Sequence, residues 1–219
     1  MEQTSVPEAK SIDPGAIPHH YGAIKGGLSW PTEEANGYFI ILGEKYTGGG
    51  TQFEGHKPKR GEIVLLAERE IQSPFLNDTL KALTDECSLV GCHDVYAEFE
   101  EKPELNMEDV LLARELLNKE AISISLNPAP FHREFKTGMD IIRLYLNDAL
   151  LFLPESSLVS QQLGVLSQVD LMERPEVKFV AINGLRFAMG AFHKYGPPGP
   201  VFKPKRRHEG PHYSVRRPR

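Results

Sequence analysis

Residues 91–99 read GCHDVYAEF, and this stretch decides how the fold of the chain is expected to be built. Its apolar run is short and is bounded by a glycine and a proline, which is typical of a buried strand rather than a helix. Glu98 stands near the carboxyl end of that strand, where an acid is costly to bury unless something cationic meets it. The carboxyl ends of strands in open α/β sheets are also where ligands gather. Glu98 is therefore either a ligand-binding residue or the start of a solvated acidic run with Glu100 and Glu101.

Length and composition favour one domain, or one domain with an appendage. The chain has 219 residues, of which 40% are hydrophobic and 25% are charged, so it can bury a proper core. Its two cysteines, Cys87 and Cys92, are too few for a disulfide framework, which fits a reducing compartment. No apolar run approaches the ~18 residues of a membrane span, and the polar start MEQTSVPEAK does not resemble a signal peptide. We therefore expect a soluble, cytoplasmic protein.

The net charge of −5 hides a basic end. Residues 203–219 carry seven basic residues against one acid, a charge of +6, so the rest of the chain carries −11. An extended, proline-rich arm of this charge seeks a polyanion or an acidic partner. A disordered tail that only keeps the protein in solution explains the composition equally well. The basic side chains that would contact a polyanion are Lys205, Arg206, Arg207, Arg216 and Arg217.

Hydrophobic patterning predicts strands alternating with helices after an irregular start. Prolines and glycines break up residues 1–36, where Asp13-Pro14-Gly15 forms a turn signature. Residues 38–46 and 62–70 read as two strands with a long polar connection, and hence as a hairpin. Further strands are expected at 95–99, 121–126 and 150–153, and helices at 75–86, 107–119, 132–146, 158–166 and 177–195. This order predicts an α/β layered fold with a mixed sheet.

Helix ends are predicted from residues that can cap them. We expect Asn77 or Ser73 to cap the helix at 75–86, and Asn106 to cap the helix at 107–119. Ser156 or Ser157 should cap the helix at 158–166. The helix over residues 132–146 is expected to begin in earnest at Met139, after a glycine.

Several familiar motifs are missing or incomplete. No GxxxxGK[ST] and no GxGxxG occurs, so the sequence has neither a P-loop nor a dinucleotide-binding fingerprint. The histidines His19, His20 and His56 lack the spaced Cys/His partners of a metal site. Cys92 and His93 are consecutive on a predicted strand and point to opposite faces, so they do not readily form a nucleophile–base pair.

Two acids stand out by their position, Asp13 in its IDPG turn and Glu98 at the end of a strand. Carboxylates brought together from separate strands repel one another unless divalent metals neutralise them, and their hard oxygens suit Mg²⁺ or Mn²⁺. Two such ions about 4 Å apart would stabilise the attacking and leaving oxygens in phosphodiester cleavage. Spacing leaves open whether Asp13 and Glu98 meet.

The order of several short motifs extends this hypothesis. Asp13-Pro14-Gly15 is followed by the hairpin of residues 38–70 and then by the strand VYAE at residues 95–98. Later come GMDIIRLYL at residues 138–146, the short strand LFLP at 151–154, and a helix that reads FVAINGLRFA at 179–188. This series resembles the C-terminal nuclease domain of the large terminase subunits of tailed bacteriophages. Those domains have an RNase H-like fold and open with a strand that carries Asp-x-Gly.

The resemblance implies an RNase H-like mixed sheet flanked by helices over residues 1–195, with a basic, proline-rich tail at 196–219. It implies that Asp13 and Glu98 hold two divalent ions, Mg²⁺ or Mn²⁺. Asn183 stands where the family has an aspartate, and a neutral amide binds a hard cation more weakly. Residues 8–12, ahead of Asp13, are also more polar than a buried central strand requires.

Two functions follow from the resemblance. The first is a metal-dependent endonuclease that cleaves double-stranded viral DNA during genome packaging in the host cytoplasm. The second is a catalytically degenerate module of the packaging machinery that binds DNA or the portal protein. In both, the implied partners are double-stranded DNA, a portal protein and an ATPase supplied by a separate chain.

Overall fold

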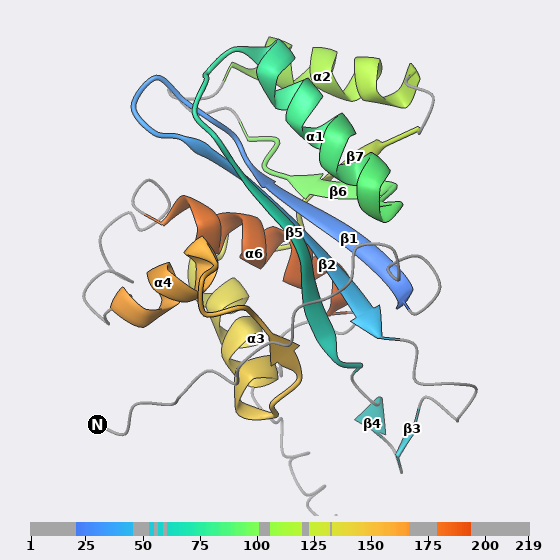
Figure 1. Ribbon diagram of the computed structural model, residues 1–219, viewed down its shortest axis with the longest axis vertical. Helices are drawn as coiled ribbons and strands as arrows, with labels where there is room; N and C mark the ends of the chain where they lie inside the picture. Colours follow the sequence, from blue (N-terminus) through green and yellow to red (C-terminus); the bar gives the residue numbers. More distant parts are fainter. Residues whose placement is uncertain are drawn as a thin grey trace, which may run out of the picture.

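The computed structural model describes residues 21–45, 53–54, 57–58, 61–100, 106–119, 123–131, 133–166 and 179–193. Its centre is a six-stranded mixed sheet with the order β7-β6-β1-β2-β5-β8 (Figure 1). The strands of this sheet are β1 (Tyr21–Ser29), β2 (Gly37–Lys45), β5 (Ile63–Ile71), β6 (Asp94–Ala97), β7 (Ser125–Pro128) and β8 (Leu151–Phe152). A separate short pair is formed by β3 (Phe53–Glu54) and β4 (Lys57–Pro58).

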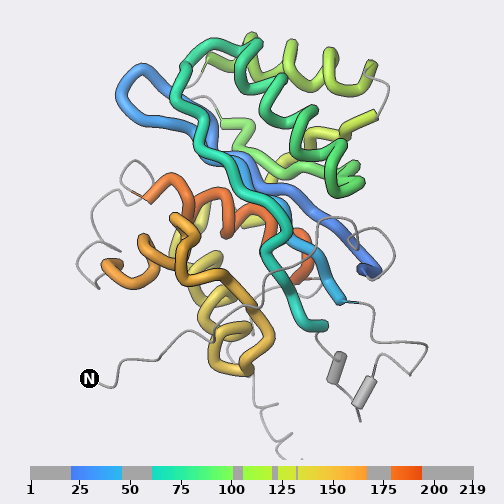
Figure 2. Tube along the Cα trace, viewed as in Figure 1, coloured from blue at the N-terminus to red at the C-terminus, as the bar shows by residue number. Residues whose placement is uncertain are grey.

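Helices cover both faces of the sheet, as Figures 1 and 2 show. On one face lie α1 (Leu76–Val90) and α2 (Met107–Lys119). On the other face lie α3 (Phe135–Asn147), α4 (Leu158–Val165) and α6 (Val180–Phe192). The predicted α/β fold with a mixed sheet is confirmed.

The central strand β1 is the main departure from the sequence prediction. Residues 21–29 belong to a segment expected to be irregular, yet β1 pairs antiparallel with β2 on one side and parallel with β6 on the other. Three of its nine residues are glycines (Gly22, Gly26 and Gly27), which lower strand propensity and conceal the strand. Packing by α6 explains one of them, because a Cβ on Gly27 would lie 2.0 Å from the carbonyl oxygen of Gly184.

The predicted hairpin between residues 38–46 and 62–70 is confirmed. β2 and β5 pair antiparallel from Gly37 opposite Ile71 to Glu44 opposite Ile63. The apolar run of β2 is buried almost completely, as expected of a strand covered on both faces. β8 extends the sheet parallel to β5, and β7 extends it parallel to β6.

Two hydrophobic clusters, one on each face, hold the layers together. Phe39 and Ile41 of β2 join Leu28 of β1 and the apolar sides of α1 and α2. Ile40 and Leu42 point the other way and pack against α3, α4 and α6. Alternate residues of one strand thus supply both cores, which requires the unbroken apolar sequence of β2.

The helix predictions are confirmed in position and corrected at several ends. The N-cap of α1 is Phe75, which makes no side-chain cap bond, so neither Asn77 nor Ser73 caps this helix. The Ser73 hydroxyl instead accepts a hydrogen bond from the Phe75 backbone N–H at 3.3 Å. Gly91 ends α1 in the left-handed conformation, with φ of 68°.

The other two predicted caps are present. The Asn106 side-chain oxygen accepts from the Glu108 backbone N–H at 3.1 Å, and the Ser157 hydroxyl accepts from the Ser160 backbone N–H at 3.0 Å. Each cap satisfies a backbone donor that the first turn of a helix would otherwise leave unpaired.

The predicted start of α3 at Met139 is wrong, because the helix begins at Phe135 and runs through Gly138. The absence of a side chain there leaves room for Arg186 of α6, since a Cβ on Gly138 would lie 2.6 Å from Cδ of Arg186. Of the strand expected at residues 121–126, residues 121 and 122 lie outside the described residues, and the described strand is β7, where Ser125 pairs with Asp94. None of the helices in the ranges described above is long and apolar enough to span a membrane.

Candidate functional site

The candidate site lies where β1 and β6 run side by side in parallel. Lys25 pairs with Asp94, and Leu28 pairs with Ala97 at the carboxyl ends of the two strands. The other edge of β6 pairs with β7. Both edges of β6 are therefore occupied, one by β1 and the other by β7.

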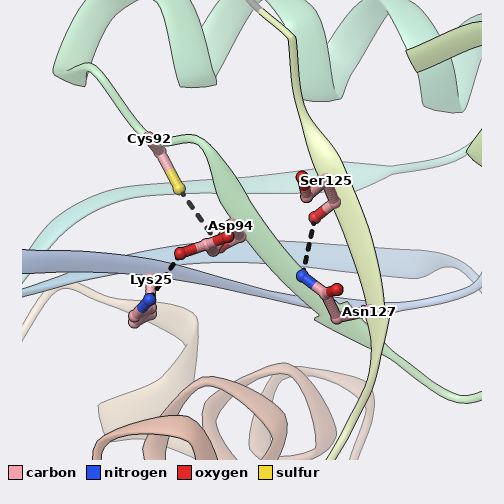
Figure 3. Close-up of polar contacts among 5 residues, drawn as sticks. All are labelled: Lys25, Cys92, Asp94, Ser125 and Asn127. Atoms are coloured by element: carbon pink, nitrogen blue, oxygen red, sulfur yellow. Dashed lines mark hydrogen bonds and ion pairs between the residues drawn. The ribbon is translucent and has the colours of Figure 1, made fainter. Parts of the chain in front are cut away.

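Lys25 and Asp94 form an ion pair between the two strands, as Figure 3 shows. The Lys25 ammonium donates a hydrogen bond to the Asp94 carboxylate at 2.5 Å, and it lies 5.8 Å from the centre of the Tyr96 ring. The lysine is the more buried partner, with 21% of its side chain exposed against 40% for Asp94. The cation is thus enclosed by a carboxylate and an aromatic face.

The environment stabilises the charged form of Lys25. Burial alone lowers the pKa of this ammonium, but its hydrogen bond to Asp94 and the nearby Tyr96 and Asp94 outweigh burial and raise the pKa above its ordinary value. Lys25 therefore stays protonated at every physiological pH.

Polar contacts next to the ion pair fix the local backbone (Figure 3). The Cys92 thiol donates to the carbonyl oxygen of Asp94 at 3.5 Å. On β7, the Asn127 side-chain amide donates to the carbonyl oxygen of Ser125 at 3.1 Å. Cys92 is buried while His93 is exposed, and both precede β6, so the expectation that they are consecutive strand residues is wrong.

Glu98 lies directly after the last residue of β6, at the carboxyl end of the strand as the sequence predicts. Its residue is half-buried, and its carbonyl oxygen accepts a hydrogen bond from the indole N–H of Trp30 at 2.9 Å. Trp30 follows β1, so this bond ties the carboxyl ends of β1 and β6 together. Glu98 is therefore held at the end of the sheet where the two parallel strands stop.

Asp13 lies outside the described residues, as do His19, His20, His56 and the basic tail. The opening strand of the described sheet is β1, and it carries Lys25-Gly26-Gly27. This triplet has the glycine of the Asp-x-Gly pattern in the right place, with lysine in the place of the aspartate. Sequence reasoning missed Lys25 because Asp13-Pro14-Gly15 matches the pattern literally. The available signal was position, since Lys25-Gly26-Gly27 stands in the strand directly before the hairpin.

Asn183 is buried within α6, with 4% of its surface exposed. Its side-chain oxygen accepts a hydrogen bond from the Arg186 guanidinium at 3.3 Å. Arg186 is itself buried, and its guanidinium lies 4.6 Å from the ring centre of Phe135 and 5.2 Å from that of Phe187. The Asn183 side-chain oxygen is thus already bound to the Arg186 guanidinium.

Close backbone packing brings α6 onto β1. The missing Cβ of Gly27 leaves room for the carbonyl oxygen of Gly184 and for the backbone nitrogen of Ala188. Lys25 is two residues before Gly27, so its side chain leaves β1 on the same face as α6. Lys25 on β1 is thus the register partner of Asp94, whereas Glu98 follows β6 four residues later and Asn183 lies on α6.

These side chains do not fit a two-metal site. Within the described part of the chain, no group of three or more His, Cys, Asp or Glu side chains is placed to hold a metal ion. The Lys25 side chain is a cation, and the Asn183 side chain is a neutral amide whose oxygen already accepts from Arg186. A hard divalent cation requires several oxygen ligands, most of them anionic.

Comparisons with known proteins support the fold. No protein-family model and no curated protein matches the sequence. The magnesium-bound large terminase nuclease of thermophilic phage G20c matches the structure with a TM-score of 0.51 at 11% sequence identity. The match covers 78% of this chain and 82% of the G20c chain. The form with bound zinc gives the same TM-score and identity and covers 81% of this chain. The large terminase nuclease domain of bacteriophage SPP1 with bound Mn has a TM-score of 0.50 at 12% identity, covering 85% of this chain and 95% of that chain. The chain therefore has the RNase H-like fold of the large terminase nuclease domains, as its order of motifs predicts.

Proposed function

We propose that this chain is a terminase-type RNase H-like domain that binds double-stranded DNA in a phage genome-packaging machine and has lost the ability to cut it. The observation that carries the proposal is the Lys25–Asp94 ion pair at the Asp-x-Gly position of the central strand. The fold supports the terminase type, since large terminase nuclease domains share it over most of this chain.

Electrostatics oppose a metal ion beside this pair. The Lys25 ammonium lies 2.5 Å from an Asp94 carboxylate oxygen, so a divalent ion bound to the same oxygen would lie within about 5 Å of the ammonium. Even with an effective dielectric constant of about 20, the repulsion between a divalent ion and an ammonium at that distance is several kcal/mol. The ammonium already neutralises Asp94, so the ion would gain little in return.

The remaining positions reinforce this argument. Asn183 is neutral, and its oxygen already accepts from Arg186. Of the three positions in the family pattern, Glu98 is the one that keeps an acid. A single carboxylate is a poor ligand set for two divalent ions, which carry a charge of +4 between them.

DNA binding is assigned to the basic tail. Residues 203–219 carry +6, against −11 for the rest of the chain, so the tail supplies the attraction that a phosphate backbone requires. Lys205, Arg206, Arg207, Arg216 and Arg217 are the side chains that we assign to phosphate contacts. This role would be exercised in the host cytoplasm, with a portal protein and an ATPase as partners.

An active nuclease is the second candidate, and the position of Glu98 favours it. Glu98 ends β6 where β1 also ends, and a carboxylate there would suit one divalent ion. In this alternative, Asp13 and Glu98 hold Mg²⁺ or Mn²⁺, and Asn183 completes the site with its amide oxygen.

The two candidates are separated by one experiment with the full chain. Supercoiled plasmid is incubated with the protein and either Mg²⁺ or Mn²⁺, while retardation of the same plasmid on a gel measures binding. We expect retarded DNA that stays supercoiled with both metals. Nicking that disappears in both Asp13→Asn and Glu98→Gln, but persists in the control Asp140→Asn, would overturn the proposal and establish the active nuclease. Asp140 is a suitable control because its side chain is 48% exposed on α3.

A further inference from the structure

We propose that the Lys25 ammonium is a built-in substitute for a metal ion. It neutralises Asp94 and joins β1 to β6 at directly paired residues, so one substitution at Lys25 should create a divalent-cation site between these two strands. This inference rests on the proposed function, because it assumes that Lys25 occupies the first position of the nuclease pattern.

The geometry of the pair supports the substitution. Lys25 and Asp94 are direct partners in the parallel register, so their side chains leave neighbouring strands side by side on one face of the sheet. The Lys25 side chain is 21% exposed, and its ammonium lies 2.5 Å from the Asp94 carboxylate. A cation enclosed to this degree against a carboxylate and the Tyr96 ring is better sheltered than a surface lysine.

A second ion pair in the same sheet shows the difference. Lys45 and Glu62 also join neighbouring strands, at 2.7 Å, and the Lys45 ammonium also lies near a ring, 5.0 Å from the centre of Phe152. Their side chains are 46% and 43% exposed, so this pair is an ordinary surface interaction. It lies at the far end of β2, away from β6, and provides a matched control.

Replacing the Lys25 ammonium by a carboxylate should both destabilise the protein and create a metal site. In Lys25→Asp, two carboxylates would stand on directly paired residues of β1 and β6 with no cation between them. Carboxylates at this separation repel each other, and a divalent ion with oxygen preference bridges them. Lys25→Asp should therefore be less stable than the wild-type protein without metal and should recover stability when Mn²⁺ is added.

The test uses the full chain and two measurements that do not depend on cleavage. Thermal unfolding is followed at increasing MnCl₂, and the free Mn²⁺ signal is measured by electron paramagnetic resonance. We expect Lys25→Asp to bind Mn²⁺ about tenfold or more tightly than the wild-type protein and than Lys45→Asp. The melting temperature of Lys25→Asp should rise with Mn²⁺, whereas that of the wild-type protein should not change beyond the response of Lys45→Asp.

Three results would overturn the inference. The first is a folded Lys25→Asp that binds Mn²⁺ no better than Lys45→Asp. The second is a wild-type protein that already binds Mn²⁺ as tightly as Lys25→Asp. If Lys25→Asp does not fold even with Mn²⁺, Lys25→Asn becomes the deciding variant, because it removes the cation without adding a second charge. A folded Lys25→Asn that binds Mn²⁺ no better than the wild-type protein is the third.

Failure of this inference is distinguishable from failure of the proposed function. A wild-type protein that nicks plasmid refutes the proposed function whatever Lys25→Asp binds. If the wild-type protein retards plasmid without nicking it and Lys25→Asp does not bind Mn²⁺, the proposed function stands. Only the inference that Lys25 substitutes for a metal ion is then refuted.

Discussion

Substitution of Gly27 by alanine tests the seating of α6 on β1, which brings the parts of the candidate site together. A Cβ at residue 27 would lie 2.0 Å from the carbonyl oxygen of Gly184 and 2.7 Å from the backbone nitrogen of Ala188. Real Cβ atoms essentially never approach within 3.0 Å, so the strand and the helix must separate by about 1 Å. Both clashing groups are backbone, and no rotamer change relieves them. Since overpacking of flexible side chains costs about 1–3 kcal/mol, we expect Gly27→Ala to lose about 3 kcal/mol or more.

Urea unfolding followed by far-ultraviolet circular dichroism measures this loss, and the fluorescence of Trp30, the one tryptophan of the sequence, gives a second probe. The loss corresponds to a melting temperature lower by about 6–12 °C for a domain of this size. Gly164→Ala in α4 is the matched control, because a Cβ there meets no atom within 4 Å. It should be neutral or stabilising by up to about 1 kcal/mol. A Gly27→Ala protein as stable as Gly164→Ala would refute the close approach of β1 and α6.

Burial raises the pKa of Glu68, although its carboxylate accepts a hydrogen bond from the Tyr38 hydroxyl. The contribution of Glu68 to the free energy of unfolding is therefore complete below about pH 4.5 and is lost as pH rises through the higher pKa of the folded state. Glu68→Gln, which keeps the acceptor, should raise the free energy of unfolding by about 1 kcal/mol or less at pH 7 and by nothing near pH 4; an equal gain at both pH values contradicts this. Lys25 has a raised folded pKa, so its contribution is complete below about pH 10.5 and is lost as pH rises through the folded value. Lys25→Met should therefore lower the free energy of unfolding by about 1 kcal/mol at pH 7, a small loss because Asp94 is 40% exposed. In urea titrations at strongly alkaline pH this loss should shrink, and a loss that does not change with pH would show that it does not come from the Lys25 charge. Deletion of residues 203–219 removes seven cationic side chains, and the slope of log affinity for DNA against log salt should flatten by about 0.9 for each lost phosphate contact; an unchanged slope in filter binding shows that the tail serves another partner.

Much of the fold could be predicted because the hydrophobic pattern is local. The unbroken apolar run of β2 predicts a strand, and the helical spacing of apolar residues in α2 predicts a helix. Asn106 and Ser157 cap helices, as their side chains suggest. β1 could not be predicted in this way. The close approach of α6 requires a glycine at residue 27, and this contact between residues far apart in the sequence leaves no signal in local strand propensity.

The candidate site was harder to predict than the fold for the same reason. The position of Glu98 at the end of β6 follows from its own strand. The partner of Asp94 depends on which strand lies beside β6, and that strand is the one that the glycines conceal. Once β1 is placed, Lys25 is the residue that pairs with Asp94. The charge that lies beside Asp94 therefore depends on a strand that local patterning does not reveal.

A crystal of the full chain soaked in Mn²⁺ tests the central claim most directly, because anomalous scattering locates the ion without reference to activity. The account predicts no anomalous peak between β1 and β6, with the Lys25 ammonium still bound to the Asp94 carboxylate. A manganese peak coordinated by Glu98 and Asp13, with Lys25 turned away from Asp94, would contradict it and restore the two-metal nuclease.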